Sequence, residues 1–447
     1  MSFTKKFEKI LKGILPSPFT IAVLLTFLTF ILALLITEPR EESNHIIQLL
    51  QFWEEGIWHP PLLVFAIQMM LMLVLGHTLA LSLPVNRIIE KGTKYCNTTA
   101  NAAAIITFST LIVSFLNWGL GLVFGAIFAR KVGEQASKKG TKLNYPLIGA
   151  AGYSGLMVWH GGISGSAPIK IAEEGHFLSY KIGVISQSET IFSIMNISVS
   201  IALILILPLI MFYLGKKNEG KVITINSEDE NKEITYSGAE RLDHSKIIAW
   251  IFGGIIISYT FYKTFILPES VSLKVITPNY INLLLLGLAI AMHNNFYSFL
   301  KAVNKAIGGS SGILIQFPLY FGIMGIMNHS GMVNIMSDFF VNISNETTFP
   351  VFTFISAGIV NIFVPSGGGQ WAVQGPIIIE AATQLGVSIS KSVMALAYGD
   401  QLTNMLQPFW ALPLLGITRL KAKEILPYTL VLFMAGAIVF ISALLIF

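Results

Sequence analysis

The sequence predicts an all-α integral membrane protein with about nine spanning helices and two re-entrant hairpins. Three observations support this fold class. Hydrophobic residues make up 53% of the 447 residues and charged residues only 12%, whereas roughly a quarter of a soluble domain is charged. Apolar runs of about 20 residues, the length that crosses a hydrocarbon core, recur from end to end. These runs are continuous, where a membrane β-strand would alternate over about ten residues.

Nine of the apolar runs are predicted to cross the membrane as single helices. The first follows four lysines between Lys5 and Lys12 and resembles a signal peptide. However, it extends from Phe19 to Thr37 and no small-residue cleavage site follows it, so we expect a retained membrane helix. The nine predicted spans cover residues 18–37, 62–83, 147–168, 186–214, 246–267, 279–296, 310–328, 391–415 and 425–446.

The positions of Lys and Arg predict which loops face the cytoplasm, where positive charge collects. Basic residues precede the first span, so we expect the N-terminus in the cytoplasm. They also flank the stretch 101–129 on both sides, which predicts a hairpin that enters from the cytoplasm and returns. The loop 329–348 is acidic and the loop 419–423 is basic. An outside loop at 329–348 and an inside loop at 419–423 are compatible with the single span 391–415 only if the stretch 349–379 is a second hairpin, entered from outside. The C-terminus then lies outside.

The chain is predicted to consist of two halves of opposite orientation. Residues 1–214 form the first repeat, 215–245 a flexible cytoplasmic linker, and 246–447 the second repeat. Each half has a span, a hairpin, an interrupted span and a plain span, and Asn117 and Asn361 each stand at the break of a hairpin. Inverted repeats with interrupted helices are typical of transporters whose binding site lies near the midplane of the bilayer.

Both predicted hairpins turn at segments that are unfavourable inside a helix. The first turns at N-W-G-L-G and the second at P-S-G-G-G-Q-W. A glycine costs about 1 kcal/mol relative to alanine in a helix, and unpaired backbone groups in lipid cost several more. Such loops are tolerated where they line a cavity, because free N–H groups bind anions and free carbonyls bind cations. A close helix crossing is the structural alternative. The substrate-binding residues predicted here are Asn117, Gly119, Gly121, Asn361, Ser366, Gly367, Gly368, Gly369 and Gln370.

Two predicted spans are interrupted and carry polar side chains. In the second of them Asp400, Asn404 and Gln407 recur at i, i+4 and i+7, on one face of a helix. Asp400 is the only acidic residue deep in a predicted span, and such residues are functional by default. A helix-end carboxylate paired with Lys391 or with a backbone donor is the structural alternative. We assign further substrate contacts to His160, Ser164, Ser166 and Gln407, and ion coupling to Asp400, Asn404, Asn117 and Asn361.

The coupling ion is left open between H⁺ and Na⁺, and a Na⁺ ion would bind at Asn117, Asn361 and Asp400. His77, in the second span, is left open between a packing role and a functional one.

Absent patterns narrow the function classes. No predicted span carries a central Arg or Lys, so we expect a carboxylate substrate to be held by helix N-termini, hydroxyls and amides. No P-loop is present, so ATP is not the direct energy source. No hydrolase or metalloprotease motif supports an enzyme, and no cofactor is expected besides a coupling ion. The basic residues lie in short loops, which excludes a nucleic-acid partner. Cys96 is the single cysteine, so no intramolecular disulfide forms. The lipid bilayer is the expected partner, and a homodimer is left open.

Long motifs in the chain resemble those of the short-chain fatty acid transporter family. They are L-P-S-P-F at 15–19, G-H-x-L-A at 76–80, N-W-G-L-G-L-V-F-G-A-I-F-A-R at 117–130, I-x-Q-F-P at 314–318, V-P-S-G-G-G-x-W at 364–371, Q-G-P at 374–376, K-S-V-M-A-x-A-Y-G-D at 391–400 and Q-P-F-W-A-L-P at 407–413. One departure is His160, which stands where family members often have Gly.

The resemblance implies an elevator-type secondary transporter with two re-entrant hairpins in a bacterial cytoplasmic membrane. Its substrates are expected to be short monocarboxylates such as acetoacetate or butyrate, driven by H⁺ or Na⁺. A transporter of another small organic anion, such as a dicarboxylate, is the alternative within this class. A channel and a membrane enzyme or scaffold are the alternatives from other classes, and saturable, gradient-driven uptake separates a transporter from a channel.

Overall fold

The computed structural model describes residues 18–39, 44–217, 220–222, 238–268, 273–364 and 366–447. The N-terminal lysines, Pro365 and most of the predicted linker lie outside these residues. The described part is almost entirely helical. Its one sheet is a two-residue antiparallel pair between β1 (Lys142–Leu143) and β2 (Lys221–Val222).

The helices follow one another through short connections. Those of the first half are α2 (Pro18–Ile36), α3 (His45–Ile57), α4 (Pro60–Ala80), α5 (Leu83–Thr93), α6 (Thr99–Leu116), α7 (Trp118–Lys139), α8 (Tyr145–Tyr153), the 3₁₀ helix η1 (Ser154–Met157), α9 (Ser166–Lys170), α10 (Ser179–Ile182) and α11 (Ile194–Lys217). Those of the second half are α12 (Glu240–Asp243), α13 (Lys246–Phe265), η2 (Leu273–Val275), α14 (Pro278–His293), α15 (Phe296–Ile307), η3 (Gly308–Ser310), α16 (Ser311–His329), α17 (Met332–Ile343), α18 (Phe349–Phe363), α19 (Gly367–Leu385), α20 (Ile389–Thr403), η4 (Asn404–Leu406), α21 (Pro408–Thr418) and α22 (Ala422–Ile446).

Several of these helices are long and apolar enough to cross a membrane. By length and composition, seven qualify in the described part of the chain. They are Phe19–Ile36, Pro60–Ala80, Thr99–Leu116, Ile194–Lys217, Lys246–Phe265, Phe296–His329 and Ala422–Ile446. The count of nine spans stays a prediction, because interrupted helices and hairpin arms do not reveal by length alone whether they cross.

Helices also form where the sequence predicted loops. α3 and α17 lie in segments that were predicted to be connecting loops, and the span predicted at 186–214 becomes a regular helix only from Ile194. α3 is explained by packing, because Gly56 on α3 meets Gly325 on α16 and lets the two backbones approach closely. This contact joins segments far apart in the sequence, and the local pattern did not reveal it.

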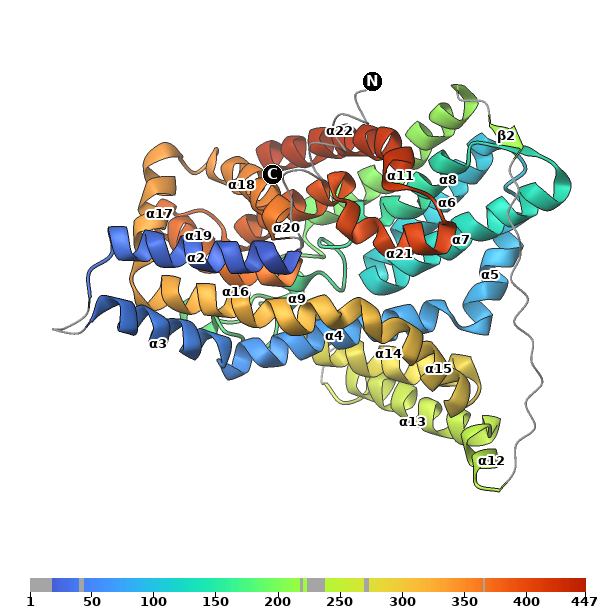
Figure 1. Ribbon diagram of the computed structural model, residues 1–447, viewed down its shortest axis with the longest axis horizontal. Helices are drawn as coiled ribbons and strands as arrows, with labels where there is room; N and C mark the ends of the chain where they lie inside the picture. The colour runs from blue at the N-terminus through green and yellow to red at the C-terminus, as the bar shows by residue number, and fades with distance from the viewer. Residues whose placement is uncertain (1–17, 40–43, 218–219, 223–237, 269–272, 365) are drawn as a thin grey trace.

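The helices form two layers that face each other (Figure 1). In the first, which we call the outer layer, α16 packs on α2, α3 and α17, and α14 packs on α4 and α13. In the second, which we call the hairpin layer, α6 packs on α7, α8 and α11, α18 packs on α20, and α19 packs on α20 and α9. Contacts between the layers are made mainly by α7 against α4 and by α19 against α16 and α17. α7 and α19, the second arms of the two predicted hairpins, therefore lie at the boundary between the two layers.

Both breaks predicted in the two long apolar stretches are present, and each stretch folds back on itself. Around Asn117, Gly121 on α7 lies against Ser114 on α6, and Gly125 lies near Thr110. In each pair the two residues lie at nearly equal distances along the chain before and after Asn117, as they do in two antiparallel helices joined by a tight turn. In the second stretch Gln370 Nε2 on α19 donates a hydrogen bond to the Ala357 carbonyl on α18, at 2.8 Å. The membrane side from which each pair enters stays a prediction.

The two spans predicted to be interrupted are interrupted. In the first, α8 and η1 end at Met157, an irregular segment follows, and α9 begins at Ser166. A Cβ atom at Gly165 would collide with the His160 carbonyl, so a residue without a side chain is required in this segment. In the second, η4 ends at Leu406 and α21 begins after an extended Gln407. Side chains from these two breaks form the centre of the hairpin layer.

Candidate functional site

In the first half, the hairpin tip is tied to the interrupted helix. The Ser164 Oγ accepts a hydrogen bond from the backbone N–H of Trp118 at 2.9 Å, and the Ile163 N–H donates to the Phe115 carbonyl at 2.7 Å. Asn117 Oδ1 caps α7 by accepting from the Leu120 N–H at 2.7 Å. The structure thus brings together two of the predicted site residues: Asn117 precedes Trp118 in the chain, and Ser164 accepts the hydrogen bond of the Trp118 N–H.

The second half has the corresponding arrangement. Asn361 Nδ2 lies within hydrogen-bond distance of three oxygens of the interrupted helix, namely the Asp400 carbonyl at 2.7 Å, Thr403 Oγ1 at 2.9 Å and Asn404 Oδ1 at 2.9 Å. Gln407 Nε2 donates back to the Asn361 carbonyl at 2.6 Å. The three predicted residues Asn361, Asn404 and Gln407 therefore form one buried cluster.

The two interrupted helices contact each other directly. The backbone N–H groups of His160 and Gly161 both donate to Gln401 Oε1, at 3.0 and 3.1 Å. Tyr153 Oη donates to the Asn404 carbonyl at 2.8 Å. Sequence reasoning did not select Gln401, although it directly follows Asp400, because its partner is a backbone loop 240 positions away.

His160 and Asp400 form a buried pair at this crossing. His160 Nδ1 and Asp400 Oδ2 are 2.5 Å apart, and the exposed fractions of the two side chains are 0% and 1%. The other ring nitrogen, Nε2, accepts a hydrogen bond from the Ala167 N–H at 3.1 Å. Because Nε2 faces a donor, it carries no proton, and one proton is shared between Nδ1 and the carboxylate. The side chain that contacts Asp400 Oδ2 is thus His160, and not Lys391, which was considered from the sequence.

Several buried polar atoms in the two hairpins and interrupted helices have no hydrogen-bond partner among the described residues. The acceptors are Asp400 Oδ1, Asn361 Oδ1, Gln370 Oε1 and Gln407 Oε1, and the donors include Asn117 Nδ2, Asn404 Nδ2, Trp118 Nε1 and Trp159 Nε1. Each unsatisfied group costs about 1–3 kcal/mol, and such groups point to function or to a bound ligand. All four acceptors belong to the second hairpin and its interrupted helix. Oxygen ligands of this kind suit a hard cation.

The glycines of the second hairpin tip are packed against both layers. A Cβ atom at Gly367 would lie 2.6 Å from Trp159 and 2.8 Å from His160. At Gly368 it would lie 2.9 Å from Phe317 and 3.0 Å from Phe65, both in the outer layer. The tip is therefore a close crossing in this conformation, which agrees with the structural alternative for these glycines. Their direct contact with substrate stays a prediction.

The first hairpin is packed in the same way. Gly119 lies against the backbone of Leu73 on α4. A Cβ atom at Gly119 would lie 3.0 Å from the Cα atom of Leu73. Ser166, on the far side of the interrupted helix, donates from Oγ to Met69 Sδ on α4 at 3.4 Å. His77 is half-buried in the last turn of α4, and its role stays open.

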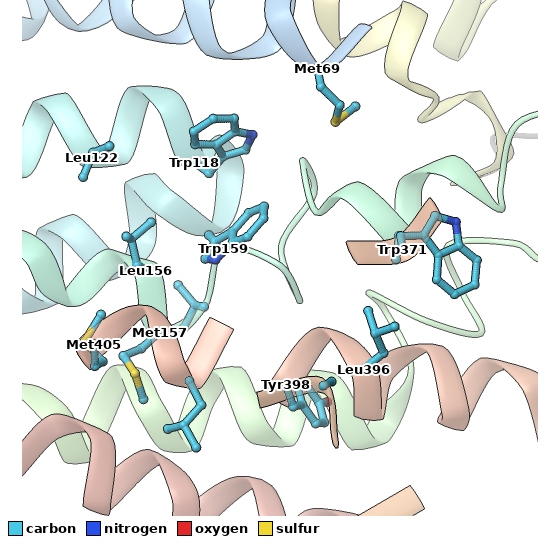
Figure 2. Packing of buried hydrophobic residues seen from close by; sticks show 14 of the residues in the cluster. Met69, Trp118, Leu122, Leu156, Met157, Trp159, Trp371, Leu396, Tyr398 and Met405 are labelled. Atoms are coloured by element: carbon cyan, nitrogen blue, oxygen red, sulfur yellow. The ribbon is translucent and has the colours of Figure 1, made fainter. Parts of the chain in front are cut away.

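Indole rings line the space beside the pair. Trp118 lies 5.7 Å from Trp159 and 5.5 Å from Trp410, measured between ring centroids, and Trp159 stacks on the His160 ring at 4.5 Å. Figure 2 shows Trp118 and Trp159 next to each other, from the first hairpin and the first interrupted helix. The rings give the pair a surrounding of low polarity, in which an uncompensated charge is costly.

A buried cation is present that sequence reasoning missed. Lys170, at the end of α9, is 2% exposed, and its Nζ lies 2.5 Å from Glu173 Oε2. The sequence predicts no buried cation for a carboxylate substrate, because no predicted span carries a central Lys or Arg. That observation does not include Lys170, because this residue lies two positions beyond the span predicted at 147–168. Its burial results from α4 and α14 covering the segment after α9. How a carboxylate substrate is held stays a prediction.

Solved structures of transporters share this fold. The YdaH transporter of Alcanivorax borkumensis superimposes with a TM-score of 0.61, at 13% sequence identity, and covers 96% of this chain and 98% of its own. MtrF of Neisseria gonorrhoeae, described with a class of antimetabolite efflux pumps, superimposes with a TM-score of 0.59 at 12% identity, over 100% of this chain and 97% of its own. These similarities concern the fold alone.

Relatives with closer sequences identify the family. A protein of Escherichia coli K12 is 36% identical over 440 residues, which are 97% of this chain and 96% of the relative. A protein of Haemophilus influenzae Rd is 36% identical over 445 residues, 96% of each chain. Both are named as candidate short-chain fatty acid transporters. The model of the family described as "Short chain fatty acid transporter" matches residues 2–447. With this match over nearly its whole length, the chain belongs to the short-chain fatty acid transporter family.

Proposed function

We propose that the protein is a secondary active transporter that moves short monocarboxylates such as acetoacetate or butyrate across the bacterial cytoplasmic membrane, and that protonation of the His160–Asp400 pair couples the substrate to the proton gradient. The observation that carries the coupling is the pair itself, 2.5 Å apart and buried between the two interrupted helices. Membership of the family supports transport and the substrate class.

The pair has one free position for a further proton. With one shared proton it carries a net charge of minus one, which is unfavourable in a buried site. His160 Nε2 cannot take the second proton while it accepts from the Ala167 N–H. Asp400 Oδ1 has no hydrogen-bond partner in the part of the chain that the structure describes, and is therefore the atom that the second proton would occupy. Protonation there makes the pair neutral and lowers the cost of moving the site through the bilayer.

Sodium is the second candidate, and the unsatisfied oxygens favour it. Asn361 Oδ1 and Gln407 Oε1, like Asp400 Oδ1, lack partners, and all three residues are joined by hydrogen bonds through Asn361. A Na⁺ ion held by such oxygens would compensate the same charge. Asn117, on the other hairpin, would complete the predicted ion ligands.

The proposed movement is that of an elevator. The hairpin layer, formed by residues of both repeats, would shift along the outer layer, with α7 sliding on α4 and α19 sliding on α16 and α17. The glycines at these contacts have no side chains that would interlock the two layers, which suits a hairpin layer that occupies two alternative positions along the outer layer. In this proposal the repeats 1–214 and 246–447 have opposite orientations, hairpin 101–129 opens to the cytoplasm and hairpin 349–379 to the outside. The N-terminus is then cytoplasmic and the C-terminus external.

The test is uptake of labelled butyrate into proteoliposomes, with Na⁺ and pH gradients imposed separately. We expect saturable accumulation driven by a pH gradient that is acidic outside, with competition by acetoacetate and weak competition by succinate. Accumulation that requires only Na⁺ would select the sodium alternative. Strong competition by succinate would select a dicarboxylate transporter, and non-saturable flux with single-channel currents would contradict the proposal.

A further inference from the structure

Glu173 is held in a site that has the composition of a carboxylate receptor. Its Oε2 lies 2.5 Å from Lys170 Nζ, and its Oε1 accepts from Gln68 Nε2 at 2.6 Å and from Asn279 Nδ2 at 3.3 Å. The three donors come from α9, α4 and α14, so the site joins the hairpin layer to the outer layer. Among the described residues, Lys170 is the one Lys or Arg that is buried.

The carboxylate in this site belongs to a segment with little regular structure. Glu173 lies in the turns between α9 and α10, and its side chain is 14% exposed. Asn279, at the start of α14, is exposed to solvent, so the site reaches the surface at this edge. The topology predicted from the loop charges has both the segment after α9 and the start of α14 on the outer face. A solute arriving from outside can therefore meet the rim of the site.

Aromatic rings adjoin the cation on its inner side. The Lys170 Nζ lies 5.4 Å from the centre of the Phe65 ring, and Phe65 lies 6.1 Å from Phe177. Phe177 in turn lies 6.4 Å from Trp371 of the second hairpin. The tip glycine Gly368 also packs against Phe65. A positively charged end next to an aromatic wall matches a short-chain fatty acid anion, with a carboxylate at one end and a small apolar chain at the other.

We propose that Lys170, Gln68 and Asn279 bind the carboxylate of the transported acid, that Glu173 occupies this site when the carrier is empty, and that Phe65 and Phe177 contact the acyl chain. The proposal rests on the proposed transport function and names the residues that recognise its substrate. Exchange of one carboxylate for another preserves the charge and all three hydrogen bonds. Glu173 thereby protects the buried ammonium, which would otherwise lack a counter-ion.

Binding of butyrate to the detergent-solubilised full-length protein, measured by calorimetry, tests this assignment separately from transport. The decisive variant is Lys170→Gln/Glu173→Gln, which removes both charges together and leaves no unpaired one. We expect its affinity for butyrate to fall about tenfold or more, since charge-assisted hydrogen bonds to the carboxylate are lost. The single variant Glu173→Gln removes the competing carboxylate, and its affinity should rise.

The matched control is the neutralised pair Lys181→Gln/Glu380→Gln. Lys181 Nζ and Glu380 Oε2 form an ion pair at 2.9 Å between α10 and α19, with both side chains 28% exposed. Butyrate should bind to this control as it does to the wild type. Phe177→Ala supplies a second readout: the ratio of hexanoate to acetate affinity should rise, because the smaller side chain leaves room for a longer chain.

The outcomes separate this assignment from the proposed function. Loss of binding in the Lys170→Gln/Glu173→Gln variant, with the control unchanged, supports the assignment. Wild-type affinity in that variant overturns it and leaves the transport proposal standing. If the wild type binds no member of the series from acetate to hexanoate, both the assignment and the proposed substrate class are wrong.

Discussion

His160 Nδ1 lies 2.5 Å from Asp400 Oδ2, although the two residues are 240 positions apart in the chain. His160 lies in the break of the first interrupted helix, and Asp400 lies in the last turn of α20, just before the break of the second. The pair is enclosed by Trp159 and by the glycine tip of the second hairpin. The pair therefore joins the two halves of the protein through a contact that is buried from solvent.

The first prediction concerns the carboxylate of this pair. Asp400→Asn keeps the shape of the side chain and can still accept from His160, so we expect the protein to fold. The amide cannot be protonated and lacks the negative charge that would attract a cation, so gradient-driven accumulation of butyrate should fall about tenfold or more. Counterflow exchange should persist, because exchange does not require release of the coupling ion. Asp338→Asn, at an exposed position of α17, is the control and should accumulate like the wild type.

The two coupling ions leave different signatures in the same variant. If the proton is coupled, the remaining transport of Asp400→Asn should lose its pH dependence. If Na⁺ is coupled, the variant should need a higher Na⁺ concentration. Wild-type accumulation under both gradients would show that Asp400 is a structural residue, and coupling would then be sought at Asn117 or Asn361.

The second prediction concerns His160, the partner of Asp400. His160→Gly removes the donor to Asp400 and the acceptor for the Ala167 N–H, and leaves a buried carboxylate oxygen unsatisfied. We expect the free energy of unfolding to fall by about 1–3 kcal/mol or more and coupled uptake to be lost. His160→Gln can still donate to Asp400 and should recover part of the stability. Equal thermal stability of the wild type and His160→Gly in detergent would contradict the role given to this hydrogen bond.

The third prediction concerns the tip of the second hairpin. Gly368→Val places a branched side chain where even a Cβ atom would lie 2.9 Å from Phe317 and 3.0 Å from Phe65. Overpacking of this kind costs about 1–3 kcal/mol and should displace the tip, so uptake is lost while the protein still inserts into the membrane. Gly254→Val on α13 is the matched control, since a Cβ atom there has no neighbour within 4 Å. Normal transport by Gly368→Val at normal expression would remove the tip from the functional site.

The fourth prediction uses the single cysteine. Cys96, between α5 and α6, is buried, and burial raises the pKa of its thiol to about 12. Because the thiolate is the reactive form, the folded wild type should react very slowly with a maleimide at pH 8, where almost all of the thiol remains protonated. Reactivity should rise as the pH approaches 12. The unfolded chain in SDS should react quickly, and fast labelling of the folded protein at pH 8 would disprove the burial.

Cysteine labelling also tests the two hairpins. In a Cys96→Ser background, cysteines at Asn117 and Ser366 should react with aqueous reagents in at least one transport state, because hairpin tips that line a pathway meet water. A cysteine at Leu28, in the middle of α2, should not react, since this exposed side chain of an apolar helix is expected to face lipid. Two unreactive tips, with substrate and with either gradient, would exclude the two-hairpin transport pathway.

The sequence alone was sufficient to predict features that depend on local pattern. An apolar run of about 20 residues has one stable arrangement in a bilayer, a helix with all backbone groups paired, so spans such as α2, α4 and α22 could be located. Clusters of glycine and proline cannot continue such a helix, and the breaks at Asn117, at 158–165 and at Gln407 follow from them. Asp400 stood out because a lone acid in an apolar run is costly unless something compensates it.

The tertiary structure decided which groups compensate one another. Asp400 pairs with His160, and Lys170 is buried by α4 and α14, because long-range packing brings together segments whose local patterns contain no sign of the partner. The helix α3 likewise depends on a glycine crossing with α16. Hydrophobic periodicity depends on neighbours three or four positions away, whereas charge compensation depends on whichever side chain the fold places within about 3 Å, and only the assembled chain determines that.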